Sequence, residues 1–172
     1  MMLGTLICIV LIAILLFFFV KTYNKFQELK SLRKSSFESL DLALNKRYDV
    51  MEELINYSGD FLEDENSAII TLLQAKLVPL KDRFEIEKKL FVELKKIMAI
   101  ISEIPEINNT KELTNIRLKL AKVEKNINEV IVTLNDLTRE YNDSIKSIPQ
   151  NIVAILCGFK ELKTYTVEYI TR

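Results

Sequence analysis

Arg47 is the residue with the most distinctive chemical setting, because it falls on the apolar stripe of a predicted helix between Leu44 and Met51. Its stem could cover the core while its head reaches water. Alternatively, its rigid guanidinium fork makes a buried contact, either with Asp49 nearby or with polar groups on a later helix. If Arg47 only reaches for water, Arg47→Lys should leave stability nearly unchanged, and a loss of several kcal/mol would exclude that interpretation.

A second polar feature is a row of asparagines, Asn128, Asn135 and Asn142, spaced by seven residues, with Tyr141 before the last of them. Asparagine is unfavourable inside helices because its side chain competes for backbone hydrogen bonds. One interpretation is a solvated edge whose asparagines reflect codon usage alone. The other is a polar ladder that fixes the register of the helices or meets a partner, as a buried asparagine does in coiled coils.

The composition argues against most catalytic and metal-binding chemistry. The chain has no histidine, which removes His-dependent triads, Glu-x-x-His di-iron sites and nearly all zinc sites. No glycine-rich phosphate loop is present. The acidic run from Glu63 to Glu65 lacks the alternating ligands and the sharp glycine turn of a calcium loop. We therefore expect no catalytic site, no metal site and no cofactor, and a protein that is not an enzyme.

The charge balance bears on nucleic-acid binding. The 24 basic and 24 acidic residues give a formal net charge of zero. No basic stripe occurs beyond a cluster close to the amino-terminal apolar segment. We therefore expect no nucleic-acid partner.

The element that must position these residues begins with an uncharged segment, residues 1–20. As a helix it would span ~30 Å, about the hydrocarbon thickness of a bilayer. Neither glycine nor proline separates Val20 from Phe26, so the helix should continue unbroken into water. We predict a transmembrane anchor over residues 1–20 and a cytoplasmic helical domain over residues 21–172.

The flanks of the anchor predict its orientation. No basic region precedes it and no small-x-small cleavage site follows it, so it does not resemble a cleaved signal peptide. The positive-inside rule places the short amino terminus outside and the following domain in the cytoplasm, as a single-pass protein of the cytoplasmic (inner) membrane. Contact with anionic lipid head groups is also expected. Both predictions depend on a cluster of basic residues after the anchor, in which Glu28 is the single acidic residue. The basic residues are Lys21, Lys25, Lys30, Arg33 and Lys34.

Helical spacing of apolar residues continues through most of the remaining chain. Gly59 ends the first helix, and a second runs from a capping box at Asp60–Glu63 to Pro105. Pro79 interrupts this second helix, and we expect a kink near residues 75–79 or two shorter helices there. A third helix begins at a capping box over Asn109–Glu112. The two remaining expectations concern the end of the chain: Pro149 ends the third helix, and a shorter last helix, bent or capped at Gly158, continues to about Ile170.

The third helix has a nearly unbroken seam of apolar residues, which is typical of near-parallel left-handed packing. We predict an all-α fold in which the transmembrane helix continues into an antiparallel bundle of three long helices plus a shorter C-terminal helix. In that arrangement the turns at Gly59 and Pro149 lie far from the bilayer, and the turn at Pro105 lies near it.

Three stretches give the chain a family resemblance. The segments Ala43–Val50 and Ile104–Ile107, followed by the series from Glu124 through Tyr141 and Asn142 to Pro149, are together similar to the motifs of the LemA family. Tyr23 and Asn24 after the anchor fit the same pattern. The sequence departs from that pattern at Glu52, Ile131, Leu134 and Ile148.

The resemblance implies a helical bundle anchored at its amino terminus in a bacterial or archaeal membrane, with no assigned enzymatic activity. It also implies that Arg47, Asn135 and Asn142 are positions of interest.

Three functional hypotheses follow. The first is a membrane-anchored interaction protein that presents helix faces to another protein. The second is a homo-oligomeric scaffold that organises or bends the membrane. The third is a ligand sensor or enzyme that uses carboxylates and Arg47, and it requires a polar cavity that holds Arg47 with two or more carboxylates.

Overall fold

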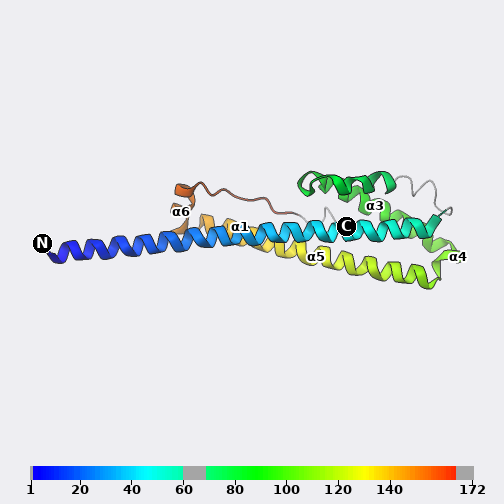
Figure 1. Cartoon of the computed structure of the whole chain (residues 1–172), viewed down its shortest axis with the longest axis horizontal. Coiled ribbons are helices and arrows are strands. Elements are labelled where there is room, and N and C mark those ends of the chain that lie inside the picture. Colours follow the sequence, from blue (N-terminus) through cyan, green and yellow to red (C-terminus); the bar gives the residue numbers. More distant parts are fainter. Residues whose placement is uncertain (1, 60–68, 166–172) are drawn as a thin grey trace. The chain divides into compact units, whose positions relative to one another are not determined.

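The computed structural model describes residues 2–59 and 69–165, and their regular structure is entirely helical (Figure 1). The all-α class is therefore confirmed. A short helical stretch also covers residues 69–73. The elements are α1 (Met2–Ser58), the 3₁₀ helix η2 (Gln74–Leu77), α3 (Leu80–Glu103), α4 (Pro105–Asn108), α5 (Lys111–Lys146) and α6 (Gln150–Cys157).

The first helix, α1, is continuous over 57 residues. It contains an 18-residue window with a mean hydropathy of 3.2, none of which is buried. Side chains along this apolar segment, such as Ile12 and Phe17, are more than half exposed. In length and composition α1 can therefore cross a membrane.

The helices belong to two compact units. Unit 1 contains the described residues of Met1–Ser36 and Leu134–Thr164, and unit 2 contains those of Phe37–Thr133 and Tyr165–Arg172. Each unit therefore includes one part of α1 and one part of α5.

In unit 2, α1 and α5 run in opposite directions. Arg47 lies 3.4 Å from Glu124, and further along α1 Glu53 lies 2.7 Å from Lys119. Residue numbers therefore rise along one helix as they fall along the other. The core of unit 2 comprises Tyr48, Val50, Met51, Leu54, Ile69, Leu90, Leu94, Ile97, Ile101, Ile107, Leu113 and Ile116.

The direction of α3 differs from our expectation. Arg83 contacts Asp41 and Glu87 contacts Arg47, so residue numbers rise together along α1 and α3. The reason lies in the chain before α3: Lys76 lies 2.7 Å from Asp49, so the chain has already turned back along α1 before α3 begins beside Asp41. The break near Pro79 takes the form of two helical pieces, which is one of the two outcomes expected there.

The turn at Pro105 is also misplaced in our expectation. The Tyr57 hydroxyl donates to the carbonyl oxygen of Ile107 at 3.1 Å and also pairs with the Thr110 hydroxyl. The carboxyl end of α1 and the turn at Pro105 therefore lie at the same end of unit 2. The prediction that they lie at opposite ends is wrong.

The start of α5 is set by Thr110. Its hydroxyl accepts a hydrogen bond from the backbone N–H of Leu113 at 3.2 Å, which is the N-cap geometry. The expected cap at Asn109 is displaced because Asn109 ends the short helix α4. The other expected capping box, Asp60–Glu63, lies outside the described residues.

In unit 1, the last helix packs beside the end of the apolar segment. Val153 and Ala154 of α6 share a core cluster with Phe26 and Leu29 of α1, and Phe18 and Phe19 pack against the same cluster. The turn at Pro149 is therefore close to the apolar segment, contrary to our prediction. Sequence periodicity predicts the length of α5, but it does not predict which end of α1 lies beside the turn that follows α5.

The helix α6 is shorter than expected. Gly158 takes the left-handed conformation, with φ +71°, and the Phe159 N–H donates to the carbonyl oxygen of Ala154 at 2.9 Å. This confirms the cap at Gly158. The prediction that the helix continues is wrong for residues 159–165, which are not helical, and its remainder lies outside the described residues.

The segment after α6 is attached to α5 by Asn142. The Asn142 amide donates to the carbonyl oxygen of Leu162 at 2.8 Å and accepts from its N–H at 2.9 Å. The Tyr141 hydroxyl donates to the carbonyl oxygen of Lys160 at 3.1 Å. The two side chains together hold residues 160–162 against α5 without regular backbone pairing.

We predict that Asn142→Ala loosens this segment. Both polar groups of Leu162 lose their partner, at a cost of about 1–3 kcal/mol each where they stay away from water. Hydrogen exchange at the Leu162 amide should therefore accelerate. The exposed Asn126 serves as the control, and Asn126→Ala should leave that amide unchanged. Equal exchange in Asn142→Ala and the native chain would contradict the assignment.

Candidate functional site

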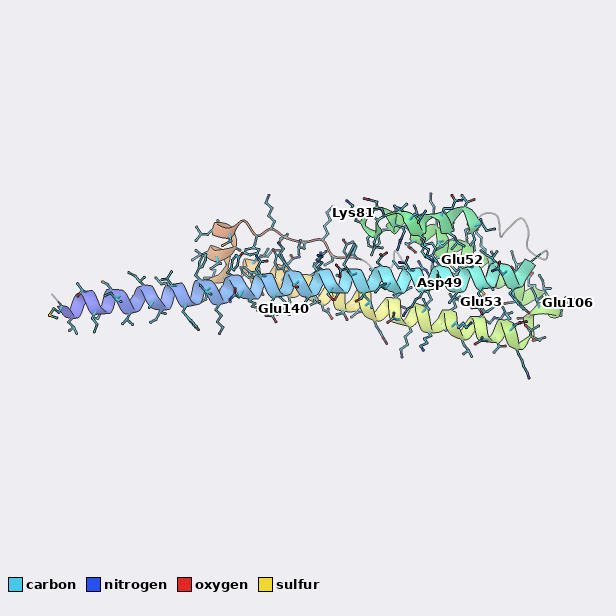
Figure 2. The ribbon with its side chains drawn as sticks, viewed as in Figure 1. Asp49, Glu52, Glu53, Lys81, Glu106 and Glu140 are labelled. Carbon is cyan, nitrogen blue, oxygen red and sulfur yellow. The ribbon has the colours of Figure 1, made fainter. Side chains whose placement is uncertain are left out.

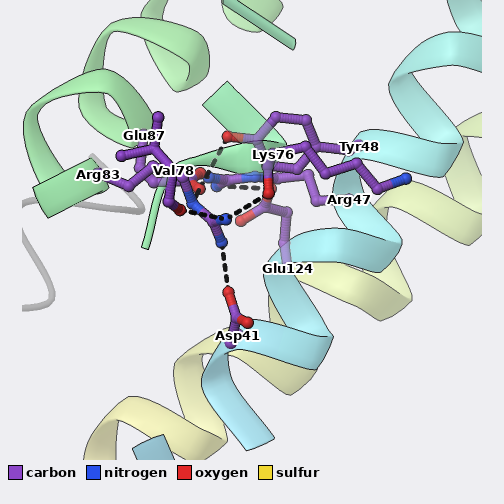
Figure 3. A network of polar contacts seen from close by, with 8 residues as sticks. All are labelled: Asp41, Arg47, Tyr48, Lys76, Val78, Arg83, Glu87 and Glu124. Atoms are coloured by element: carbon purple, nitrogen blue, oxygen red, sulfur yellow. Dashed lines mark hydrogen bonds and ion pairs between the residues drawn. The ribbon is translucent and has the colours of Figure 1, made fainter. Parts of the chain in front are cut away.

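The described residues contain a buried ion network in unit 2, to which three helices contribute (Figure 3). Arg47 comes from α1, Arg83 and Glu87 from α3, and Glu124 from α5. The side chains of Arg47 and Glu87 have no exposed surface, and that of Arg83 has 1%. Buried ions at this density are stable only when they compensate one another.

Glu87 lies at the centre of this network. Its Oε2 pairs with Nη2 of Arg47, and its Oε1 lies 2.7 Å from Nε of Arg83. The Tyr48 hydroxyl also donates to Oε1, at 3.0 Å. One carboxylate therefore receives two guanidinium groups and a phenol, which compensates for its removal from water.

Arg83 connects Glu87 to the edge of the network. Its Nη2 lies 2.7 Å from Oδ1 of Asp41, and its Nη1 donates to the carbonyl oxygens of Lys76 and Val78, both at 3.3 Å. The guanidinium also lies 5.5 Å from the centroid of the Tyr48 ring. Arg83 thus fixes the irregular segment before α3 against α1.

Glu124 completes the network from α5. Its Oε1 lies 3.4 Å from Nη1 of Arg47, while its buried Oε2 has no hydrogen-bond partner among the described residues. Burial raises the pKa of Glu124 and outweighs the lowering effect of the Arg47 charge. Glu124 is therefore the weakly compensated member of the network.

Tyr48 is held in its neutral form. Burial, reinforced by the negative charge of Glu87, raises the pKa of Tyr48. The phenol therefore keeps its proton at neutral pH and serves as a permanent donor to Glu87.

The structure decides between the two interpretations of Arg47. Its guanidinium is buried and paired, so the interpretation in which it reaches for water is wrong. The pairing with a polar group on the third helix is found at Glu124. Asp49 is not its partner: Asp49 is exposed and pairs with Lys76, and Figure 2 shows it on the same part of α1 as Glu52 and Glu53.

Sequence reasoning missed Arg83 and Glu87. Both lie on the apolar stripe of α3, at the spacing of three and four that connects Leu80 to Leu90. A signal for these two residues is present in the sequence. They are opposite charges on an apolar stripe, and Arg47 is a charge on the apolar stripe of another helix.

The three asparagines have different surroundings. Asn142 bonds to the backbone of Leu162, as described above. Asn135 is half-buried in unit 1. Asn128 belongs to unit 2, and its buried Oδ1 has no hydrogen-bond partner among the described residues. A role for these residues in meeting a partner stays a prediction.

The basic residues after the apolar segment divide into two groups. Lys21, Lys25, Lys30 and Lys34 are exposed, although Lys25 lies 3.7 Å from Glu140. Arg33 is half-buried in unit 1. Its guanidinium donates to the Thr138 hydroxyl at 2.8 Å and to the carbonyl oxygen of Lys163 at 3.1 Å. Arg33 therefore has a structural role besides any role at the membrane.

The network is suited to holding helices together. Its ions are paired with one another and largely removed from solvent. Within residues 2–59 and 69–165, no group of three or more histidine, cysteine, aspartate or glutamate side chains could hold a metal ion.

A known protein family matches the chain. The model of the LemA family matches residues 36–172, which is most of the chain and includes the whole network. No curated protein and no solved structure matches the chain.

We predict that Arg47→Lys destabilises the protein. Lysine keeps the charge but loses the planar fork that reaches both Glu87 and Glu124. The loss should be about 1.5–3 kcal/mol, the usual contribution of a hydrogen bond to a charged group. Urea unfolding of the detergent-solubilised chain measures it.

The matched control is Arg139→Lys, because Arg139 is exposed and lies 3.4 Å from Asp136 on the same helix. Its effect should stay within about 0.5 kcal/mol. Equal effects of the two substitutions would contradict the buried pairing of Arg47.

The raised pKa of Glu124 predicts a pH-dependent contribution to stability. A carboxyl whose pKa is higher in the folded state favours folding while it is protonated, and this contribution is lost as pH rises through the folded-state pKa. The stability of the native chain relative to Glu124→Gln should therefore fall with rising pH. Unfolding curves across acidic to neutral pH test this.

The control is Glu129→Gln, on the exposed side of α5. A fall of the same size relative to this variant would show that the loss of any carboxylate on α5 has this effect, and would contradict the assignment to Glu124. If the free energy of unfolding of the native chain, relative to that of Glu124→Gln, is constant or rises with pH, the assignment is contradicted.

Proposed function

The chain belongs to the LemA family, and from that premise we propose that it is a membrane-anchored, non-enzymatic interaction protein of the cytoplasmic membrane. In this proposal the apolar segment of α1 spans the bilayer once. The helices after Val20 form a cytoplasmic bundle that presents its surfaces to another protein.

The observation that carries the proposal is the continuity of α1. One unbroken helix contains both the exposed apolar segment and Arg47 of the buried network. Exposed apolar side chains over such a length are expected in lipid and are costly in water. The same helix that enters the bilayer therefore supports unit 2.

The network supports a non-enzymatic role. The hypothesis of a sensor or enzyme requires Arg47 and two carboxylates around a polar cavity. Glu87 and Glu124 supply the carboxylates, but Arg47 and Glu87 have no exposed surface on which a ligand could lie. The geometry therefore favours charges that stabilise the fold.

A basic groove in unit 2 is the surface that we propose for the partner. It has a volume of about 660 Å³ and lies along α1 and α5. Four lysines line it, together with Asp49 and Glu129: Lys46, Lys119, Lys122 and Lys125. Lys119 pairs with Glu53 and Lys125 lies 3.8 Å from Glu129, so the lining keeps a small positive excess. This excess favours an acidic segment of a partner protein.

Crosslinking in intact cells tests this function. The tagged protein is purified after crosslinking, and each band is identified by mass spectrometry. A discrete band that contains another protein supports the interaction role. A series of self-multiples alone would contradict it and favour the homo-oligomeric membrane scaffold.

The groove is tested in the same experiment with the double variant Lys46→Glu, Lys122→Glu. Reversal of these charges should remove the partner band. The control is Lys81→Glu with Lys96→Glu, at exposed sites on α3. Loss of the band in both double variants, or in neither, would contradict the assignment of the groove.

The proposed orientation predicts how Cys157 reacts. Cys8 and Cys157 are the two cysteines of the chain, and both are free thiols. In a Cys8→Ser background, a membrane-impermeant maleimide should label Cys157 only after the cytoplasmic membrane is opened. Labelling of Cys157 in intact spheroplasts would overturn the cytoplasmic placement.

A further inference from the structure

The helix α6 has an exposed apolar stripe. Within its eight residues, Val153 and Ala154 are buried, whereas Ile152, Ile155 and Leu156 are more than half exposed. These three residues share one side of the helix, because Ile155 and Leu156 follow Ile152 by three and four residues. Ile148, in the turn two residues before α6, is also exposed.

The buried side of α6 fixes its position along α1. Val153 and Ala154 share a cluster with Phe26, and Phe18 and Phe19 pack against that cluster. Phe18 and Phe19 belong to the end of the apolar segment, and Phe26 follows Val20 by about 9 Å of helix. The position of α6 thus corresponds to the boundary between acyl chains and head groups in the proposed anchoring.

The direction of α6 suits the same boundary. Figure 1 shows α6 lying crosswise to α1 within unit 1, near the end of α5. When α1 crosses the bilayer, a helix that lies across it runs along the membrane plane. Interfacial helices take this orientation and bury one apolar face about 5–10 Å into the boundary region.

Basic residues surround this position in unit 1. Lys21 and Lys30 on α1, and Lys160 after α6, are exposed, and Lys30 lies 5.6 Å from the centroid of the Phe159 ring. Ammonium groups at this depth can reach phosphate groups of lipids while their stems cover apolar surface.

We infer that α6 is a second membrane contact, an interfacial helix whose stripe of Ile152, Ile155 and Leu156 lies in the lipid boundary, together with the exposed Ile148 before it. The inference rests on the proposed anchoring of α1. Lipid is favoured over a protein partner because α6 packs beside the end of the exposed apolar segment with which α1 begins, and lipid covers that segment in the proposal. This contact would fix how unit 1 is rotated about the axis of α1 relative to the membrane surface.

Depth-dependent fluorescence quenching tests this inference. The chain has no tryptophan, so single-tryptophan variants report one position each. The full chain with Ile155→Trp, or with Leu156→Trp as a second reporter on the stripe, is reconstituted into phosphatidylcholine vesicles with or without brominated acyl chains. Circular dichroism confirms that each variant is folded.

Two controls accompany the reporters. Leu11→Trp lies in the apolar segment of α1, and Leu118→Trp lies at an exposed position of α5 in unit 2. We expect blue-shifted emission and a loss of intensity in brominated vesicles for Leu11→Trp and for both α6 reporters. Leu118→Trp should show neither.

The outcomes separate the two proposals. If only Leu11→Trp is quenched, the anchor stands and the interfacial role of α6 is overturned. If the α6 reporters shift to the blue without quenching by bromine, a protein surface covers the stripe, which also overturns it. If Leu11→Trp is not quenched, the proposed anchoring itself fails, and the inference about α6 fails with it.

Discussion

Unit 2 depends on the two ion pairs that the carboxylate of Glu87 makes with the guanidinium groups of Arg47 and Arg83. All three side chains are removed from water, and a buried ion that loses its partner costs far more than an ion pair gains. A shift of α3 by one turn along α1 would separate Glu87 from Arg47. The network therefore favours one register of these helices, whereas apolar side chains alone tolerate several arrangements.

The same requirement explains the irregular chain before α3. Arg83 reaches back to the carbonyl oxygens of Lys76 and Val78 and across to Asp41. These contacts hold the break at Pro79 in one conformation, so that α3 can begin beside Asp41 and run in the direction of α1. The break at Pro79, which the sequence predicts as a kink or as two shorter helices, is thus the turn that sets the direction of α3.

The sequence predicts local features well and relations between helices poorly. The continuous α1, the break at Pro79, the long α5 and the cap at Gly158 follow from local rules of propensity and capping. Arg47 was identifiable because a charge on an apolar stripe is conspicuous. Its partner Glu87 is 40 residues away, and no periodicity states which helices become neighbours. The direction of α3 and the position of α6 were missed for the same reason, and the role of Asn142 required the fold of residues 160–162.

The central claim is that Arg47 and Glu87 compensate each other in the core, and a double-mutant cycle tests it most directly. The free energy of unfolding is measured for the full chain, Arg47→Met, Glu87→Met and the double variant. We expect the double variant to be more stable than the sum of the single effects predicts, by about 1–3 kcal/mol, because each single change leaves a buried charge without its partner. Additive effects, within about 0.5 kcal/mol, would contradict the claim.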